Sequence, residues 1–279
     1  MPAVKKARII DSIKKDDIKQ SLEKETRTDG RKFLDYRQLK IETNVLQKTN
    51  GSARVTLGDS EVLAGIKVET AKPFPDTPDQ GVIVCNAEML PIASVYLEPG
   101  PPNEDTIELS RVSDRGIRES GMIDTSQLVI KEGEKVYSVF IDVAVINEDG
   151  NLFDAVSYAI ATALSLCTMP KFKIEKDEII ILDETKPLPI KSLPVSTTFV
   201  KINDKIMIDP TADEQELSSA RLTIVTDENG KYVSGQKGKP GGFTFDELSH
   251  ITSTSKPVSY THLRAHETEA DLVCRLLLE

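Results

Sequence analysis

The chain has 279 residues, and 35 Lys and Arg against 45 Asp and Glu give it a formal net charge of −10. A hydrophobic fraction of 39% with 29% charged residues excludes a disordered or collagen-like chain, and no apolar run is long enough to span a membrane. Charges crowd the N-terminus too densely for a secretory signal, and three cysteines without CxxC spacing argue against a disulfide framework and a zinc site. We expect a cytoplasmic protein with no metal, cofactor or membrane partner.

The first predicted element is an amphipathic helix over residues 9–25. Ile10, Ile13, Ile18 and Leu22 fall on one side of a helical wheel, and charged residues cover the other side. We expect this helix to pack across the edge of a sheet.

Strands and two helices are predicted for the next part of the chain. Apolar and β-branched runs predict strands over 39–46, 52–70 with a turn at 57–60, 80–90 and 135–150. Residues 105–120 predict a helix with acidic residues in its first turn, as the helix dipole favours. Residues 153–166 predict an Ala-rich helix that is apolar on most sides and therefore central.

The part of the chain after Pro170 is again rich in predicted strands. They span 178–182, 193–200, 205–209, 220–225 and 231–235, and a final helix begins at 243–251. Each half thus consists of strands followed by one or two helices. This order favours an α+β fold of two related layers over regular βαβ alternation.

The last segment, 257–279, differs in character from the rest of the chain. It resembles a read-through or linker sequence, so we expect it to be a non-native tail and set it aside from fold reasoning.

The sharpest candidate site is a stripe of three arginines on the first internal helix. Arg111, Arg115 and Arg118 are spaced i, i+4, i+7 and so project from one narrow face. Guanidinium groups on such a stripe can bind successive phosphates of a polynucleotide. The alternative is pairing within the helix, Glu108 with Arg111 and Asp114 with Arg118, and spacing alone favours this alternative.

Two turns carry weaker signals. Arg27, Arg31 and Arg37 surround Asp29-Gly30, which we interpret as a structural cluster of salt bridges. The turn at 148–151 precedes the Ala-rich helix, where helix N-terminal amides can bind an anion, but Asn151 is an equally good N-cap.

Taken in order, these segments resemble the RNase PH family of phosphorolytic exoribonucleases. The resemblance runs over roughly 25–256 and rests on ETRTDGRKFLDYRQLK, NGSARVTLGDSEVLAG, CNAEMLPIAS, NEDGNLFDA and ARLTIVTDENGKYVSGQKG. The combination of TDGR, DTPDQG and EPGPPNEDTIELSRVSDRGIRES is similar to the non-catalytic RNase PH-like subunit of the archaeal exosome.

The resemblance implies an RNase PH-like fold, with two βα layers around a mixed sheet and central helices. It implies an N-terminal helical extension over 1–24 and a domain over 25–256, whose first half ends at about 170. It also implies a hexameric ring, a trimer of heterodimers with the catalytic subunit, to which RNA-binding cap subunits attach. Single-stranded RNA would be degraded from its 3′ end by phosphate, and Arg111, Arg115 and Arg118 would line the RNA path.

Two departures from the pattern of active members imply that this chain does not catalyse by itself. Where active members have the hydroxyl and guanidinium that bind phosphate, this chain has Leu152 and Phe153. Where they have a catalytic acid, it has Arg221. Neither an apolar side chain nor a guanidinium can replace those groups.

Two other functions stay open at this point. The chain could be an active exoribonuclease with an atypical site, in which Asp209 or Asp213 supplies the missing acid. It could also be a purely structural ring subunit whose arginines are internally paired.

Overall fold

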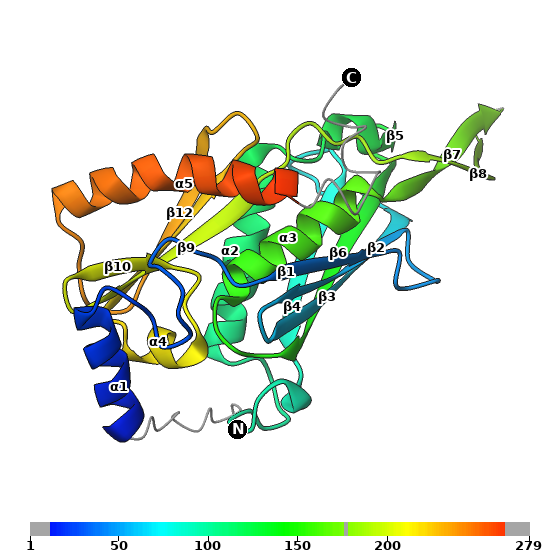
Figure 1. Ribbon diagram of the computed structural model, residues 1–279. Helices are drawn as coiled ribbons and strands as arrows, with labels where there is room; N and C mark the ends of the chain where they lie inside the picture. The colour runs from blue at the N-terminus through cyan, green and yellow to red at the C-terminus, as the bar shows by residue number, and fades with distance from the viewer. Residues whose placement is uncertain (1–11, 176–177, 266–279) are drawn as a thin grey trace.

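The computed structural model describes residues 12–175 and 178–265, and Figure 1 shows two β-sheets with a pair of helices between them. The first sheet has six strands. Five follow the order β1 (Leu39–Thr43), β2 (Gly51–Leu57), β3 (Ser60–Ala71), β6 (Lys135–Asn147) and β4 (Val82–Met89), and β5 (Val129–Lys131) pairs with β6. Only β4 runs parallel to its neighbour, so the sheet is mixed.

The hairpin between β2 and β3 sets the register of this sheet. Leu57 pairs with Ser60, which leaves the two-residue turn Gly58-Asp59 predicted from the sequence. Gly58 has a φ of 58°, a left-handed conformation that such tight hairpin turns require and that glycine adopts without strain.

The middle layer consists of α2 (Glu104–Ser120) and α3 (Leu152–Ser165). Helix α3 is buried along almost its whole length because it packs on β2 and β3 on one side and on the second sheet on the other. Helix α2 covers β4. It begins at Asn103, whose side chain accepts a hydrogen bond from the Thr106 amide, and it ends at Gly121 in a left-handed conformation.

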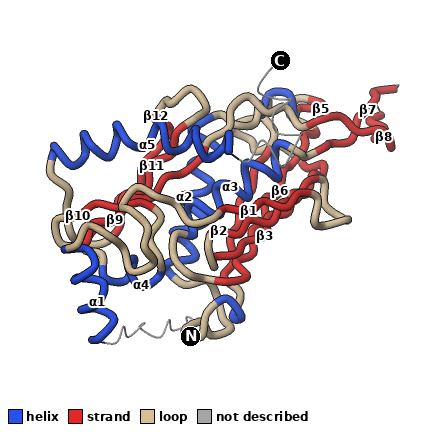
Figure 2. Tube along the Cα trace, viewed as in Figure 1, coloured by secondary structure: helices blue, strands red, loops and turns tan. Residues whose placement is uncertain are grey.

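The second sheet is antiparallel, with the order β10 (Lys205–Ile208), β9 (Val195–Ile202), β11 (Ala220–Thr226) and β12 (Tyr232–Gly238). One face of this sheet meets α2 and α3. On the other face lies α5 (Phe245–Ala265), whose Ile251 is buried with Phe199 and Ile224. Figure 2 shows the resulting order of layers, with red strands on both sides of the central helices and α5 outside the second sheet.

Helix α1 (Ser12–Glu23) packs against the β10 edge of the second sheet, as the sequence predicted. Ile18 and Leu22 are buried against Val200 and Met207. The prediction for Ile13 is wrong: its side chain is 66% exposed, because the contact with the sheet is made by the later turns of the helix. Ile10 lies outside the described residues.

The elements that were not predicted are β5, α4 (Ala212–Leu217), β7 (Thr168–Glu175) and the short 3-10 helices η1 (Pro91–Ala93) and η2 (Thr125–Leu128). Strand β7 pairs with β8 (Glu178–Pro187) in a hairpin that extends away from the rest of the fold in Figure 1. Helix α5 continues to Ala265, into the segment set aside above, and residues beyond it lie outside the described part.

The predicted fold class is confirmed, with an α+β architecture, a mixed sheet and central helices. Among the helices of the described residues, none is long and apolar enough to cross a membrane.

Candidate functional site

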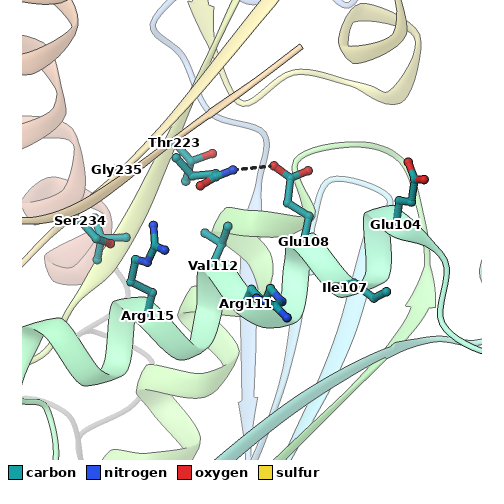
Figure 3. Close-up of a pocket in the computed structure, with 11 residues that line it drawn as sticks. Glu104, Ile107, Glu108, Arg111, Val112, Arg115, Thr223, Ser234 and Gly235 are labelled. Atoms are coloured by element: carbon teal, nitrogen blue, oxygen red, sulfur yellow. Dashed lines mark hydrogen bonds between the residues drawn. The ribbon is translucent and has the colours of Figure 1, made fainter.

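A groove of about 320 Å³ runs between α2 and the strands β11 and β12 of the second sheet. Figure 3 shows that the α2 side of the groove contributes both acidic and basic side chains. The wall formed by the strands carries polar side chains beside the apolar Val225, and it includes Gly235. The lining residues are Glu104, Ile107, Glu108, Arg111, Val112, Arg115, Thr223, Val225, Ser234, Gly235 and Gln236.

Arg111 and Arg115 supply the positive charge of this groove. Both residues are exposed, and neither has an ion-pair or hydrogen-bond partner within the described parts of the chain. In Figure 3 the side chain of Arg115 points toward Ser234 on β12. Two unpaired guanidinium groups one turn apart can each bind a phosphate oxygen pair.

Arg118, the third residue of the predicted stripe, is placed differently. Its Nε lies 2.8 Å from both carboxylate oxygens of Asp114, and its Nη2 donates to the carbonyl of Ile83 at 2.5 Å. Arg118 does not line the groove. Of the two pairs expected within the helix, the one between Asp114 and Arg118 is therefore confirmed.

The other expected pair, between Glu108 and Arg111, does not form. Oε1 of Glu108 instead accepts hydrogen bonds from Nη2 of Arg221 at 2.6 Å and from Nε2 of Gln236 at 3.1 Å. Figure 3 shows Glu108 pointing from α2 toward the strands, where a dashed line marks the second of these bonds. Glu108 thus pairs with Arg221 on β11 and not with Arg111 on its own helix.

Arg221 and Phe153, two of the three positions that depart from the active pattern, contact each other. The guanidinium carbon of Arg221 lies 4.4 Å from the centroid of the Phe153 ring, which is a cation–π contact. Arg221 is only 7% exposed, and the backbone of Gly238 faces its guanidinium so closely that a Cβ on Gly238 would lie 2.5 Å from Nη2. Leu152, the third position, packs against the main core. All three positions are thus occupied by side chains that pack within the chain.

The N-terminus of α3 is also covered. The amide of Asn151 donates to Oε1 of Gln215 on α4 at 3.1 Å. Gly150 packs so tightly on the start of α4 that a Cβ would lie 2.5 Å from the carbonyl carbon of Thr211. Asn151 occupies the N-cap position, but its side chain makes no capping bond, which corrects the prediction of an ordinary N-cap.

Asn151 instead belongs to a buried polar cluster around Asp209. The Asp209 carboxylate accepts hydrogen bonds from Asn151 Nδ2 at 2.8 Å, Arg31 Nη1 at 2.9 Å, and Arg37 Nη2 at 2.8 Å. Burial alone would raise the pKa of Asp209, but the hydrogen bonds and charge of Arg37 outweigh it and hold that pKa below its usual value. The salt-bridge cluster predicted around Asp29 is confirmed, and Asp209 is its centre.

These contacts bear on the atypical active site considered above. Asp209 is fully buried and bound to two arginines, so it is closed to a substrate. Asp213 forms an exposed ion pair with Lys14 at 3.4 Å. Neither acid lines the groove beside Arg111 and Arg115.

Asp154, in the first turn of α3, is the most perturbed acid near this cluster. It is fully buried and accepts hydrogen bonds from Tyr36 Oη, Asn151 Nδ2 and both the amide and the hydroxyl of Thr198. Burial raises the pKa of Asp154 to about 7, because the hydrogen bonds only partly offset the loss of hydration. Sequence reasoning missed this residue, since nothing in its local pattern marks it.

The fold, together with the groove beside α2, defines an RNase PH-like protein. The family model described as "3' exoribonuclease family, domain 1" matches residues 35–170, and the model for domain 2 of the same family matches residues 192–252. The chain belongs to this 3′ exoribonuclease family.

The chain is similar to several archaeal proteins and structures. The chain is 48% identical to the exosome complex component Rrp42 of Thermococcus kodakarensis, over 87% of this chain and 90% of that protein. It is 45% identical to the protein of the same name from Methanocella arvoryzae, over 89% and 93%. A chain of the Archaeoglobus fulgidus exosome with RNA bound to the active site superposes with a TM-score of 0.83 at 41% identity, covering 91% of this chain and 97% of that one. A chain of an archaeal exosome core gives 0.79 at 38% identity, with 92% and 97% covered.

Proposed function

We propose that this chain is a non-catalytic subunit of an archaeal exosome and binds the RNA backbone through Arg111 and Arg115. It alternates with a catalytic RNase PH-like subunit in a hexameric ring, a trimer of heterodimers, and helps to structure the partner's active site. Cap subunits that bind RNA attach to this ring, and the complex acts in the cytoplasm. The family domain spans 25–256 and carries an N-terminal extension over 1–24.

The observation that carries the proposal is the contrast between the two neighbouring sites. At the altered phosphate site, Phe153 and Arg221 contact each other, and Arg221 is neutralised by Glu108. In the adjoining groove, Arg111 and Arg115 have no ion-pair partner among residues 12–175 and 178–265. The chain therefore combines a surface suited to phosphodiesters with a place unsuited to free phosphate. Contacts of this kind are made to the backbone, so we expect weak sequence preference and binding that falls with salt.

The unpaired arginines also favour RNA binding over a purely structural role. A purely structural role does not account for two neighbouring arginines, Arg111 and Arg115, that lack counter-charges among the described residues, in a chain of net charge −10. Like charges one helical turn apart repel each other, and a polyanion relieves that repulsion.

The decisive experiment measures phosphate-dependent release of nucleoside diphosphates from single-stranded RNA. It compares this protein alone, the catalytic RNase PH-like subunit from the same organism alone, and the two combined. We expect no release from this protein alone and a much higher rate from the mixture than from the partner alone. Release by this protein alone, unaffected by further purification, would overturn the interpretation of Leu152, Phe153 and Arg221.

A further inference from the structure

Arg111 lies between two acids at the spacing that normally produces ion pairs on a helix. Glu108 precedes it by three residues and Asp114 follows it by three. Side chains three apart on a helix are neighbours, so either acid is within reach of Arg111. An ion pair with either one would place a negative charge beside the guanidinium and compete with RNA phosphates.

Both acids are bound to other arginines. Asp114 holds Arg118 through both carboxylate oxygens, and Glu108 holds Arg221. Arg118 is a residue of the same helix, whereas Arg221 reaches Glu108 from β11, 113 positions further along the chain.

Arg221 is fixed in this role by its surroundings. Its side chain is 8% exposed, the Phe153 ring lies against one part of the guanidinium, and the Gly238 backbone closes another. Its Nε is buried without a hydrogen-bond partner in the described structure, so Glu108 is the group that compensates its charge. A buried guanidinium without a carboxylate partner is costly, so the ion pair between Arg221 and Glu108 is strongly favoured.

From these contacts we propose that Arg221 is a positioning residue for RNA binding: it holds Glu108 away from Arg111 and so leaves the Arg111 charge available to a phosphodiester. The side chain at the position of the absent catalytic acid thus acts on the RNA groove next to it. This inference rests on the proposed function, since it concerns the RNA affinity of Arg111.

The test is a set of variants in the assembled ring, with affinity for a fluorescent single-stranded oligoadenylate as the readout. Arg221→Met keeps much of the side-chain volume and removes the charge. We expect it to weaken RNA binding by about two- to fivefold, the range that a new surface ion pair between Glu108 and Arg111 would produce. Arg221→Lys keeps a cation beside Glu108 and is expected to retain most of the affinity.

The specific readout is the coupling between positions 221 and 108. Glu108→Gln should raise RNA affinity more in the Arg221→Met background than in the wild type, because Glu108 is free to pair with Arg111 only in that background. In an Arg111→Met background this coupling should disappear. If the effects of Arg221→Met and Glu108→Gln are simply additive, or if the coupling persists without Arg111, the proposal is wrong.

Two controls separate this proposal from simpler failures. Ring assembly and thermal unfolding of each variant show whether Arg221→Met acts through misfolding. If it does, the effect of Glu108→Gln on RNA affinity is compared between Arg221→Lys and the wild type instead. If Arg111→Met alone leaves RNA affinity unchanged, the proposed function of Arg111 fails. A crystal structure of Arg221→Met then decides the positioning role of Arg221. If the Glu108 carboxylate is still remote from the Arg111 guanidinium in that structure, the positioning role is rejected.

Discussion

The guanidinium of Arg221 lies over the ring of Phe153, with 4.4 Å between its central carbon and the ring centroid. These are two of the positions at which the chain departs from the pattern expected of active family members. Because they contact each other, the two departures are structurally coupled. A cation on β11 is compatible with an aromatic ring at the start of α3, whereas it would be repelled by a guanidinium at that position, which is the side chain expected there in active members.

Reversing the charge at position 221 should destabilise the protein. Arg221→Asp would place a carboxylate beside Glu108 in a nearly closed space, so we expect the free energy of unfolding to fall by about 2 kcal/mol or more. Arg221→Met should cost less, since it leaves only Glu108 without its partner and that side chain is 28% exposed. Urea titration of the three proteins measures both differences, and equal losses for Asp and Met would contradict the expectation.

The three arginines of α2 should differ in their effect on RNA. Arg115→Glu and Arg111→Met are expected to weaken RNA retention by the assembled ring without preventing assembly. Removing one ion pair between an arginine and an RNA phosphate should lower the slope of log affinity against log salt by about 0.7. Arg118→Met should have a smaller effect, because Arg118 is already paired with Asp114.

Arg54→Met is a matched control for these measurements. Arg54 lies on β2 of the first sheet, is exposed and is within 3.6 Å of acids on neighbouring strands. A loss of RNA affinity from Arg54→Met as large as that from Arg111→Met would show that the effect reflects net charge and not the groove.

Asp154 should make the free energy of unfolding fall as pH rises from about 4 to about 7, which is opposite to the usual effect of a carboxyl group. The pKa of its carboxyl is about 7 in the folded protein against an ordinary value of 3.8, so the folded state binds this proton more tightly than the unfolded state. The resulting stabilisation is present in full below about pH 4 and is lost as pH rises to about 7, with a slope of up to about 1.4 kcal/mol per unit.

The variant Asp154→Asn isolates this effect, because an amide does not titrate. Subtracting its free energy of unfolding from that of the wild type at pH 5 and at pH 7 cancels most other groups. We expect the wild type to lose stability relative to the variant over this interval. A difference that is constant with pH would mean that Asp154 is ionised throughout.

Two glycines with similar backbone conformations should respond differently to substitution. Gly121 and Gly150 have φ values of 63° and 81°, so alanine is strained at both, by about 1 kcal/mol. A Cβ at Gly121 meets nothing within 4 Å, whereas at Gly150 it would meet backbone atoms at the start of α4. Thermal unfolding should show Gly150→Ala to be at least about twice as destabilising as Gly121→Ala.

Local patterns were enough to predict most of the elements that build the two sheets. The alternation in β3, the Gly58-Asp59 turn and the apolar surface of α3 each depend on residues close in sequence, and the structure confirms them. Helix α4 was missed although its capping box of Thr211 and Glu214 is a local signal. Strand β7 was missed because Pro170 and alternating lysines interrupt its apolar pattern.

Local sequence patterns could not predict the contacts that define the site. Spacing predicted a pair between Glu108 and Arg111, and it was wrong because Arg221, far away in sequence, competes for the same carboxylate. A spacing of four residues was right for Asp114 and Arg118, where no charged side chain from another element among the described residues competes for the carboxylate. Pairing within a helix is thus predictable only on a face that no other charged element approaches.

The cluster around Asp209 also constrains the order in which the chain can become structured. The Asp209 carboxylate holds Arg31 and Arg37 ahead of β1, and the latter contact joins residues 172 positions apart. During synthesis Arg31 and Arg37 therefore emerge long before Asp209, so their shared contact with this carboxylate forms only after β9 and β10 have been made. The cluster around Asp209 can consequently be completed only when most of the chain has been synthesised.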